Sequence, residues 1–264
     1  LSSVRAVEDA LGIQVPQNAR ILRDLMGGIQ YVQDHVVHFY HLPALDWVDF
    51  VSALDADPSA TADLAQSISP WPLSTESYWL EVKDKLLAFV NSGQLGIFAN
   101  GYWGHPAYKL PAEANLMAVA HYLEALNWQR EVIKVHAVLG SKNPHPQTYL
   151  VGGMSTALDP ESQSAINADS LAFIRQKVQE AKRFVEQVYI PDLLAVASFY
   201  PEWFALGEGL GNFMSYGEFP TSTGDFFLPQ GIILDRDLST VHPVDQAKIT
   251  EYIARSWYDY SEGD

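Results

Sequence analysis

The hydrophobic and polar positions of this chain follow the period of an α-helix over three long stretches. Apolar residues recur three and four positions apart over residues 17–42, 112–139 and 169–199, and this spacing gives a helix one continuous apolar face. Each apolar stripe is wide enough that its helix must be buried against a neighbour. The pattern therefore predicts a mainly α protein in which the three helices pack against one another.

Shorter helices are marked by their terminal residues. Asp57 followed by Pro58 is typical of a helix N-cap and first helical turn. Ser74 suits the N-cap of another helix, which Gly93 would end. Pro191 lies inside the third long stretch, where it removes a backbone donor. We therefore expect two shorter helices between the first and second long ones, and a kink near Pro191.

Glycine, proline and aromatic residues mark the segments that have no helical period. Residues 93–111 predict an ordered loop or a pair of short strands, and residues 142–153 predict a loop. Short aromatic and β-branched runs predict peripheral β elements over 212–220 and 226–235. A last helix is expected over 243–260. The elements together favour one domain over residues 1–264.

Composition excludes several classes of partner. The 264 residues carry 16 Lys and Arg against 32 Asp and Glu, a formal net charge of −16, and such a surface repels phosphate backbones and anionic headgroups. We expect no nucleic-acid partner. No stretch approaches the roughly 20 apolar residues of a membrane span, and the first residues, LSSVRAVEDALGI, lack the pattern of a signal peptide. Direct membrane insertion is therefore not expected, and no targeting signal is predicted.

A cluster of histidines lies at the end of the first long helix. In DHVVHFYHL, Asp34, His38 and His41 share one helical face, and His35 is one step around it. Such a row could bind a metal, or each ring could pack in a helix interface and bond a neighbouring carbonyl or acid. The zincin motif H-E-x-x-H is absent, and Pro43 follows closely. The packing interpretation is the more common outcome for such a row.

His145 differs because it lies in the proline-flanked loop KNPHP, where a histidine is as often functional as structural. The chain contains neither G-x-S-x-G nor G-x-x-x-x-G-K-[ST], so a hydrolase or a nucleotide enzyme has no motif to support it. It also contains no cysteine, which excludes disulfides and every thiolate-ligated metal from what this chain makes alone.

Several segments together resemble the large subunit of [NiFe] hydrogenases. They are SSVRAVEDALGIQVPQNARILRDLM, DHVVHFYHLPALDWVDFVSAL, NGYWGHPAYKLPAEANLMAVAHYLEAL, GSKNPHP with LVGG, and YIPDLLAVASFY. SISPWPLS and NGYWGHPAYKLP look most like the membrane-bound uptake group. The resemblance runs in order over the whole chain, and it covers the central portion of such a subunit without its N- and C-terminal segments. It implies a long-helix bundle of the hydrogenase large-subunit type.

The resemblance also implies a chemistry for the parent protein. That protein would oxidise H2 reversibly at a nickel–iron centre held by two cysteine pairs, and would pass electrons to a small subunit with iron–sulfur clusters. Both pairs would lie outside this chain, so no metal ligand is assigned within it and no metal centre is expected in it alone. A complex of the uptake type would lie on the periplasmic side of the membrane.

Residue roles follow from the same resemblance. Asp34 would lie above the nickel–iron centre, in the layer of residues just outside the metal ligands, and would orient an arginine from the absent C-terminal half. His38 would support this layer by hydrogen bonding, and His145 would approach the small subunit. We expect all three near one open, largely apolar face. The alternative is a non-catalytic helical fragment, or a divergent or engineered module, that folds or binds a partner without a metal centre.

Overall fold

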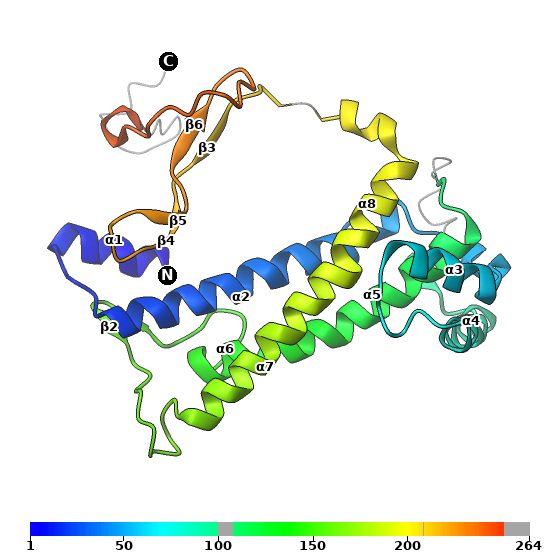
Figure 1. The fold of residues 1–264 in the computed structure, drawn as a ribbon, viewed down its shortest axis with the longest axis horizontal. Coiled ribbons are helices and arrows are strands. Elements are labelled where there is room, and N and C mark those ends of the chain that lie inside the picture. The colour runs from blue at the N-terminus through cyan, green and yellow to red at the C-terminus, as the bar shows by residue number, and fades with distance from the viewer. Residues whose placement is uncertain (100–107, 208, 251–264) are drawn as a thin grey trace. The chain divides into compact units, whose positions relative to one another are not determined.

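Helices make up most of the structure, which is a computed structural model that describes residues 1–99, 108–207 and 209–250 (Figure 1). Close contacts divide the chain into two units, Leu1–Pro201 and Glu202–Asp264, and each is described by itself. The prediction of a single domain therefore stays a prediction. The helices of the first unit are α1 (Ser2–Leu11), α2 (Gln17–His41), α3 (Pro58–Ile68), α4 (Glu76–Asn91), α5 (Ala112–Val132), α6 (Lys134–Gly140), α7 (Ala168–Phe184) and α8 (Ile190–Phe199).

The helix termini follow local chemistry, with one shift. Asp57 caps α3 as expected, because its carboxylate accepts the Ala60 N–H at 2.9 Å, and Pro58 begins the first turn. The cap of α4 is Thr75, whose hydroxyl accepts the Tyr78 N–H at 3.3 Å, so the expectation of Ser74 was wrong by one residue. Gly93 follows the end of α4 with a φ of 70°. α1 was not predicted.

Two of the long helical stretches are interrupted. The second stretch forms α5 and α6, which meet at Ile133. The third forms α7, a π-helical turn over Val185–Tyr189, and α8, with Pro191 at the start of α8. Proline cannot donate a backbone hydrogen bond, and a wider turn before it accommodates the lost bond. The kink expected at Pro191 is thus a π-helical turn.

The strands are short and antiparallel. In the first unit, β1 (Tyr149–Leu150) pairs with β2 (Gly153–Met154), inside a segment that was expected to be a loop. In the second unit, β3 (Phe213–Ser215) pairs with β6 (Gly231–Ile233), and β4 (Glu218–Pro220) pairs with β5 (Phe226–Leu228). These four confirm the short β elements. The expected helix over 243–260 is wrong up to residue 250, where only the 3-10 turn Gln246–Lys248 forms, and residues 251–264 lie outside the described part.

α5 is the centre of the first unit. Every residue from Ala114 to His121 is buried, and α2, α3, α4 and α7 all pack against α5. The long helical stretches therefore bury apolar side chains around this helix, as the periodicity predicts, except over α8, where only Asp192 is buried. The large buried side chains include Trp79 on α4, Leu116 on α5 and Tyr40 on α2. The mainly α fold class is confirmed.

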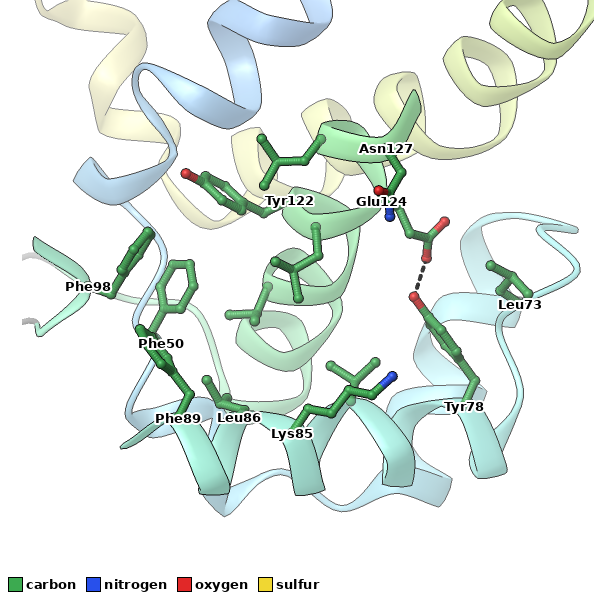
Figure 2. A pocket seen from close by; sticks show the side chains of 14 residues that line it. Phe50, Leu73, Tyr78, Lys85, Leu86, Phe89, Phe98, Tyr122, Glu124 and Asn127 are labelled. Carbon is green, nitrogen blue, oxygen red and sulfur yellow. Dashed lines mark hydrogen bonds between the residues drawn. The ribbon is translucent and has the colours of Figure 1, made fainter. Parts of the chain in front are cut away.

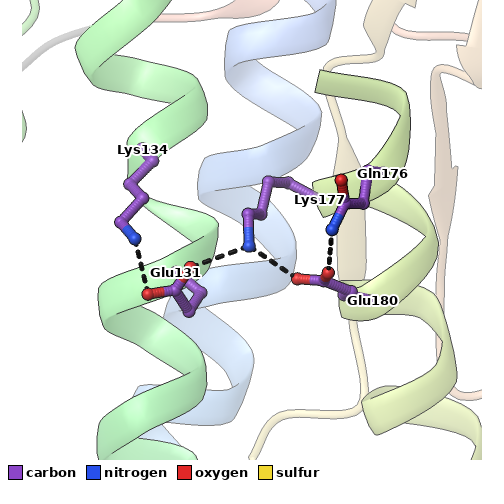
Figure 3. Close-up of polar contacts among 5 residues, drawn as sticks. All are labelled: Glu131, Lys134, Gln176, Lys177 and Glu180. Atoms are coloured by element: carbon purple, nitrogen blue, oxygen red, sulfur yellow. Dashed lines mark hydrogen bonds and ion pairs between the residues drawn. The ribbon is translucent and has the colours of Figure 1, made fainter. Parts of the chain in front are cut away.

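A charged network joins the far end of α5 to α7 (Figure 3). The Nζ of Lys177, a buried residue of α7, lies 2.7 Å from Glu131 of α5 and 2.8 Å from Glu180. Glu131 also accepts a hydrogen bond from Lys134 at 2.6 Å, and Glu180 accepts one from Gln176 at 2.8 Å. The hydrogen bonds from Lys134 and Lys177 lower the pKa of Glu131 to about 2. The network links the junction of α5 and α6 to α7.

Candidate functional site

Asp34, His35 and His38 lie on the solvent-exposed face of α2. Tyr31 and Leu42, which are also exposed, stand one helical turn before and after this group. The ring of Tyr31 contacts that of His35, with centroids 4.6 Å apart. Since neither His35 nor His38 is buried in a helix interface, the packing interpretation is wrong for both. The sequence predicts a shared face for Asp34, His38 and His41, and the structure leaves Asp34 and His38 exposed.

His41 is different, because it turns toward α5. Its Nε2 lies 3.2 Å from the carbonyl oxygen of Tyr122, and the two rings meet edge to face. Burial lowers the pKa of His41, and the contact with the Tyr122 carbonyl offsets only part of this effect. A neutral ring that packs against a neighbouring helix is the structural role that the packing interpretation predicted, and here it is confirmed.

His145 is exposed in the loop after α6, with a positive φ of 58°. The loop is tied to α2 through Asn143, whose side-chain amide contacts Gln33 Oε1 at 3.5 Å and His136 Nδ1 at 2.6 Å. The other ring nitrogen of His136 lies 2.8 Å from the carbonyl oxygen of Met26. Gln33 directly precedes Asp34 in the chain, so the loop of His145 contacts α2 at a residue next to Asp34. Whether the three predicted residues share one apolar face stays a prediction.

A buried ion pair holds α1, α2 and the β1–β2 hairpin together. Both terminal nitrogens of Arg23 bond the Glu8 carboxylate, at 2.9 and 2.7 Å, and one of them also reaches the carbonyl oxygens of Leu150 and Gly153 at 2.8 Å. Glu8 in turn accepts the Gly152 N–H at 2.7 Å. The hydrogen bonds from Arg23 hold the pKa of Glu8 below its usual value although burial opposes them. No sequence pattern signals this pair, because Glu8 and Arg23 lie on two separate helices, α1 and α2.

A second buried polar cluster joins α2, α5 and α8. Asp192 accepts a hydrogen bond from the Tyr40 hydroxyl at 2.6 Å, and its same oxygen lies 2.7 Å from His121 Nδ1. Burial, together with the nearby charge of Asp192, raises the pKa of Tyr40 well above its usual range. The sequence gives only one signal for this cluster: His121 and Asp192 are polar positions inside otherwise apolar helical stretches.

An apolar groove of about 760 Å³ opens between α4 and α5 (Figure 2). Aromatic side chains line one end, among them Phe50, Phe98 and Tyr122. At the other end Tyr78 donates a hydrogen bond to Glu124 at 2.6 Å, and burial raises the pKa of Tyr78. None of the predicted site residues lines this groove.

The donor chemistry of the chain does not suit a nickel–iron centre. A centre of this kind requires soft sulfur ligands, and the 264 residues include no cysteine. Within the ranges that the structure describes, no three His, Asp or Glu side chains are grouped so that they could hold a metal ion.

The described part also contains no helix that is long and apolar enough to cross a membrane.

The family model for nickel-dependent hydrogenases matches residues 1–264, the whole chain. The chain belongs to the nickel-dependent hydrogenase family. It is 50% identical over 275 residues to the uptake hydrogenase large subunit of Rhizobium leguminosarum bv. viciae, and 51% identical over 275 residues to that of Bradyrhizobium diazoefficiens. Identity to the hydrogenase-1 large chain of Escherichia coli (strain K12) is 46% over 273 residues. The resemblance to hydrogenase large subunits is thereby confirmed.

These hydrogenase relatives are about twice as long as the chain. The Rhizobium alignment covers 99% of this chain but 46% of the relative, and the Escherichia coli alignment covers 98% and 46%. Solved structures give the same result. The reduced Ni-Fe-Se hydrogenase from D. vulgaris Hildenborough matches with a TM-score of 0.63 and 26% identity, over 96% of this chain and 43% of that one. The chain therefore spans about half the length of the hydrogenase large subunits that it matches.

Proposed function

We propose that this chain is the central helical portion of a large subunit whose complete form oxidises H2 reversibly. The identity of about half of all positions along the entire chain to uptake hydrogenase large subunits is the observation that supports it. In this proposal two electrons from each H2 pass to a small subunit with iron–sulfur clusters, and the protons leave to solvent. The nickel–iron centre itself is bound by cysteines that lie in other segments of the parent.

Asp34 is proposed to orient a guanidinium from another segment of the parent above the metal centre. Its exposure on α2 supports this role, since the carboxylate is available to a group outside this chain. Carboxylate–guanidinium pairs are bidentate and fix orientation as well as charge. His38, one turn further along the same open face, is proposed to support this layer by hydrogen bonding.

His145 is proposed to contact the small subunit. It is exposed, and the Asn143–Gln33 contact holds its loop against α2. A solvent-facing histidine on an anchored loop can meet a partner without a large change in backbone position. The histidine and Asp34 would thus serve different steps, one near the electron exit and one near the metal centre.

The experiment uses the complete enzyme with both subunits and compares Asp34→Asn, His145→Ala and the control His35→Gln. Asp34→Asn keeps the side-chain shape and removes its charge, so we expect a loss of H2 oxidation of about 10- to 100-fold with nickel and iron content unchanged. His145→Ala should slow electron transfer to an acceptor and preserve D2–water exchange, which needs no acceptor. Full activity of Asp34→Asn, or a similar loss in His35→Gln, would contradict the proposed site.

The isolated chain is proposed to be inactive and free of stoichiometric nickel and iron, because its sequence offers no sulfur donor from cysteine. This is also the observation that favours the second candidate, a non-catalytic helical module. Metal analysis of the purified 264-residue chain tests the first statement. Activity of the complete enzyme then separates the two candidates, since a module that makes no metal centre would be inactive in that setting too.

The parent complex is proposed to lie on the periplasmic side of the membrane, as a peripheral component. The similarity to uptake hydrogenase large subunits supports this location. Protease accessibility in spheroplasts tests it, because a periplasmic large subunit is digested when the outer membrane is opened and a cytoplasmic one is protected.

A further inference from the structure

α8 is an apolar helix whose one buried residue is an acid. Its sequence is IPDLLAVASF, and of these ten residues only Asp192 is buried. Ile190, Leu193 and Leu194 are all exposed. A helix of this composition would ordinarily be held by burial of its apolar side chains. Here the start of α8 is instead held in the interior through a carboxylate.

Both side-chain hydrogen bonds of Asp192 are made by the same carboxylate oxygen. Oδ2 accepts from Tyr40 of α2 and contacts His121 of α5, at 2.6 and 2.7 Å. A carboxylate oxygen can only accept, so His121 donates from Nδ1. Asp192 Oδ1 and His121 Nε2 are buried, and neither has a hydrogen-bond partner among the described residues. A buried carboxylate is costly unless a positive charge lies beside it. This cost favours an ion pair between the Asp192 carboxylate and a protonated His121 ring.

The backbone before Asp192 departs from the regular α-helical hydrogen-bond pattern. The π-helical turn Val185–Tyr189 directly precedes α8, and Pro191 removes a backbone donor beside it. α8 continues directly from this turn in the chain. Beyond the end of α8, the hydroxyl of Tyr200 accepts the Lys109 N–H at 2.8 Å. The helix is thus fixed by polar groups near both of its ends.

We propose that the buried His121–Asp192 ion pair, together with the Tyr40 hydroxyl, is a latch that fixes the direction of α8 and weakens when His121 loses its positive charge. The latch sets where the exposed apolar residues of α8 point. The other titratable groups with an electrostatic effect on the latch are Glu124 of α5, which acts on His121 and Tyr40, and Tyr189 of the π-helical turn, which acts on Tyr40.

The pH at which the latch weakens follows from the opposing effects on the pKa of His121. Burial lowers the pKa of this ring, but the charge of Asp192 and the hydrogen bond to it outweigh burial and raise the pKa above the usual 6.5. A raised pKa means that His121 carries its charge below 6.5 and that the charge-assisted part of the latch is lost as the pH rises through the folded-state pKa. Tyr40 stays protonated throughout, since its own pKa is raised.

Amide hydrogen exchange of the purified protein, followed by mass spectrometry, tests the latch. Asp192→Asn retains the shape of the side chain and removes its charge. The variant should speed exchange of the α8 amides by about ten-fold or more at neutral pH, with α3 unchanged. His136→Gln is the matched control. His136 is also a fully buried histidine, but its ring nitrogens bond the Met26 carbonyl and Asn143, so exchange in α8 should stay at the wild-type rate.

The wild-type protein supplies a second measurement that needs no variant. After correction for intrinsic exchange rates, protection of α8 should fall as the pH rises above neutrality, while protection of α3 stays constant. In Asp192→Asn this pH dependence should disappear. If α8 protection is independent of pH in the wild type, or if Asp192→Asn exchanges within about two-fold of wild type in α8, the latch does not exist.

Discussion

Replacement of Arg23 by methionine tests how much of the fold depends on one buried ion pair. The Arg23 and Glu8 side chains are 4% and 7% exposed, and Arg23 also bonds the carbonyls of Leu150 and Gly153. Arg23→Met leaves the Glu8 carboxylate buried with the Gly152 N–H as its remaining hydrogen-bond donor. Removal of one partner from a buried pair typically costs 3–5 kcal/mol, and since Glu8 keeps the Gly152 N–H we expect about 3 kcal/mol.

Urea denaturation at neutral pH measures this loss. Arg20→Met, on the preceding turn of α2, is the control and should change the free energy of unfolding by less than about 1 kcal/mol. The double variant Arg23→Met with Glu8→Leu should be more stable than Arg23→Met alone, because no buried charge remains without its partner. With Glu8→Leu measured alone as well, the double-mutant cycle gives the coupling between the two sites.

The same pair predicts a pH dependence. The pKa of Glu8 is lowered from 4.5 in the folded protein, so its contribution is present above pH 4.5 and is lost as the pH falls through the folded-state pKa. In Arg23→Met burial dominates and raises that pKa. The stability gap between wild type and Arg23→Met should therefore shrink in acid. A gap below about 1 kcal/mol at neutral pH, or one that does not change with pH, would refute this reasoning.

Three further outcomes follow from local geometry. Gly140→Ala places a methyl group 2.6 Å from the Pro146 side chain and should destabilise the protein by about 1–3 kcal/mol. Gly28→Ala in α2, where the added methyl group meets no atom within 4 Å, should stabilise it by up to about 1 kcal/mol. Urea denaturation measures both changes. Asp57→Ala removes the cap of α3 and should cost about 1 kcal/mol in the same assay, with a smaller loss expected for Asp57→Asn. Lys177→Met should raise the pKa of Glu131, by NMR titration, because one of its two lysine donors is lost.

The amino-acid sequence determines the helical elements and most of their ends. Hydrophobic periodicity over 17–42 predicts α2, and the Asp57–Pro58 pair predicts the start of α3, because both signals act within one or two helical turns. α1 also has such a signal in Gly12, which ends it in the left-handed conformation. Family membership is likewise readable from ordered segments of sequence.

Only the tertiary structure decides which face of each helix is covered and which polar groups meet. The row Asp34–His38–His41 is one helical face in sequence, yet the fold exposes the first two residues and turns the third toward α5. The bond between Tyr40 and Asp192 spans 152 positions and that between Arg23 and Leu150 spans 127. Hydrophobic periodicity shows which face of a helix is apolar. It carries no information on a partner that chain folding brings within 3 Å, since such contacts depend on how whole helices pack.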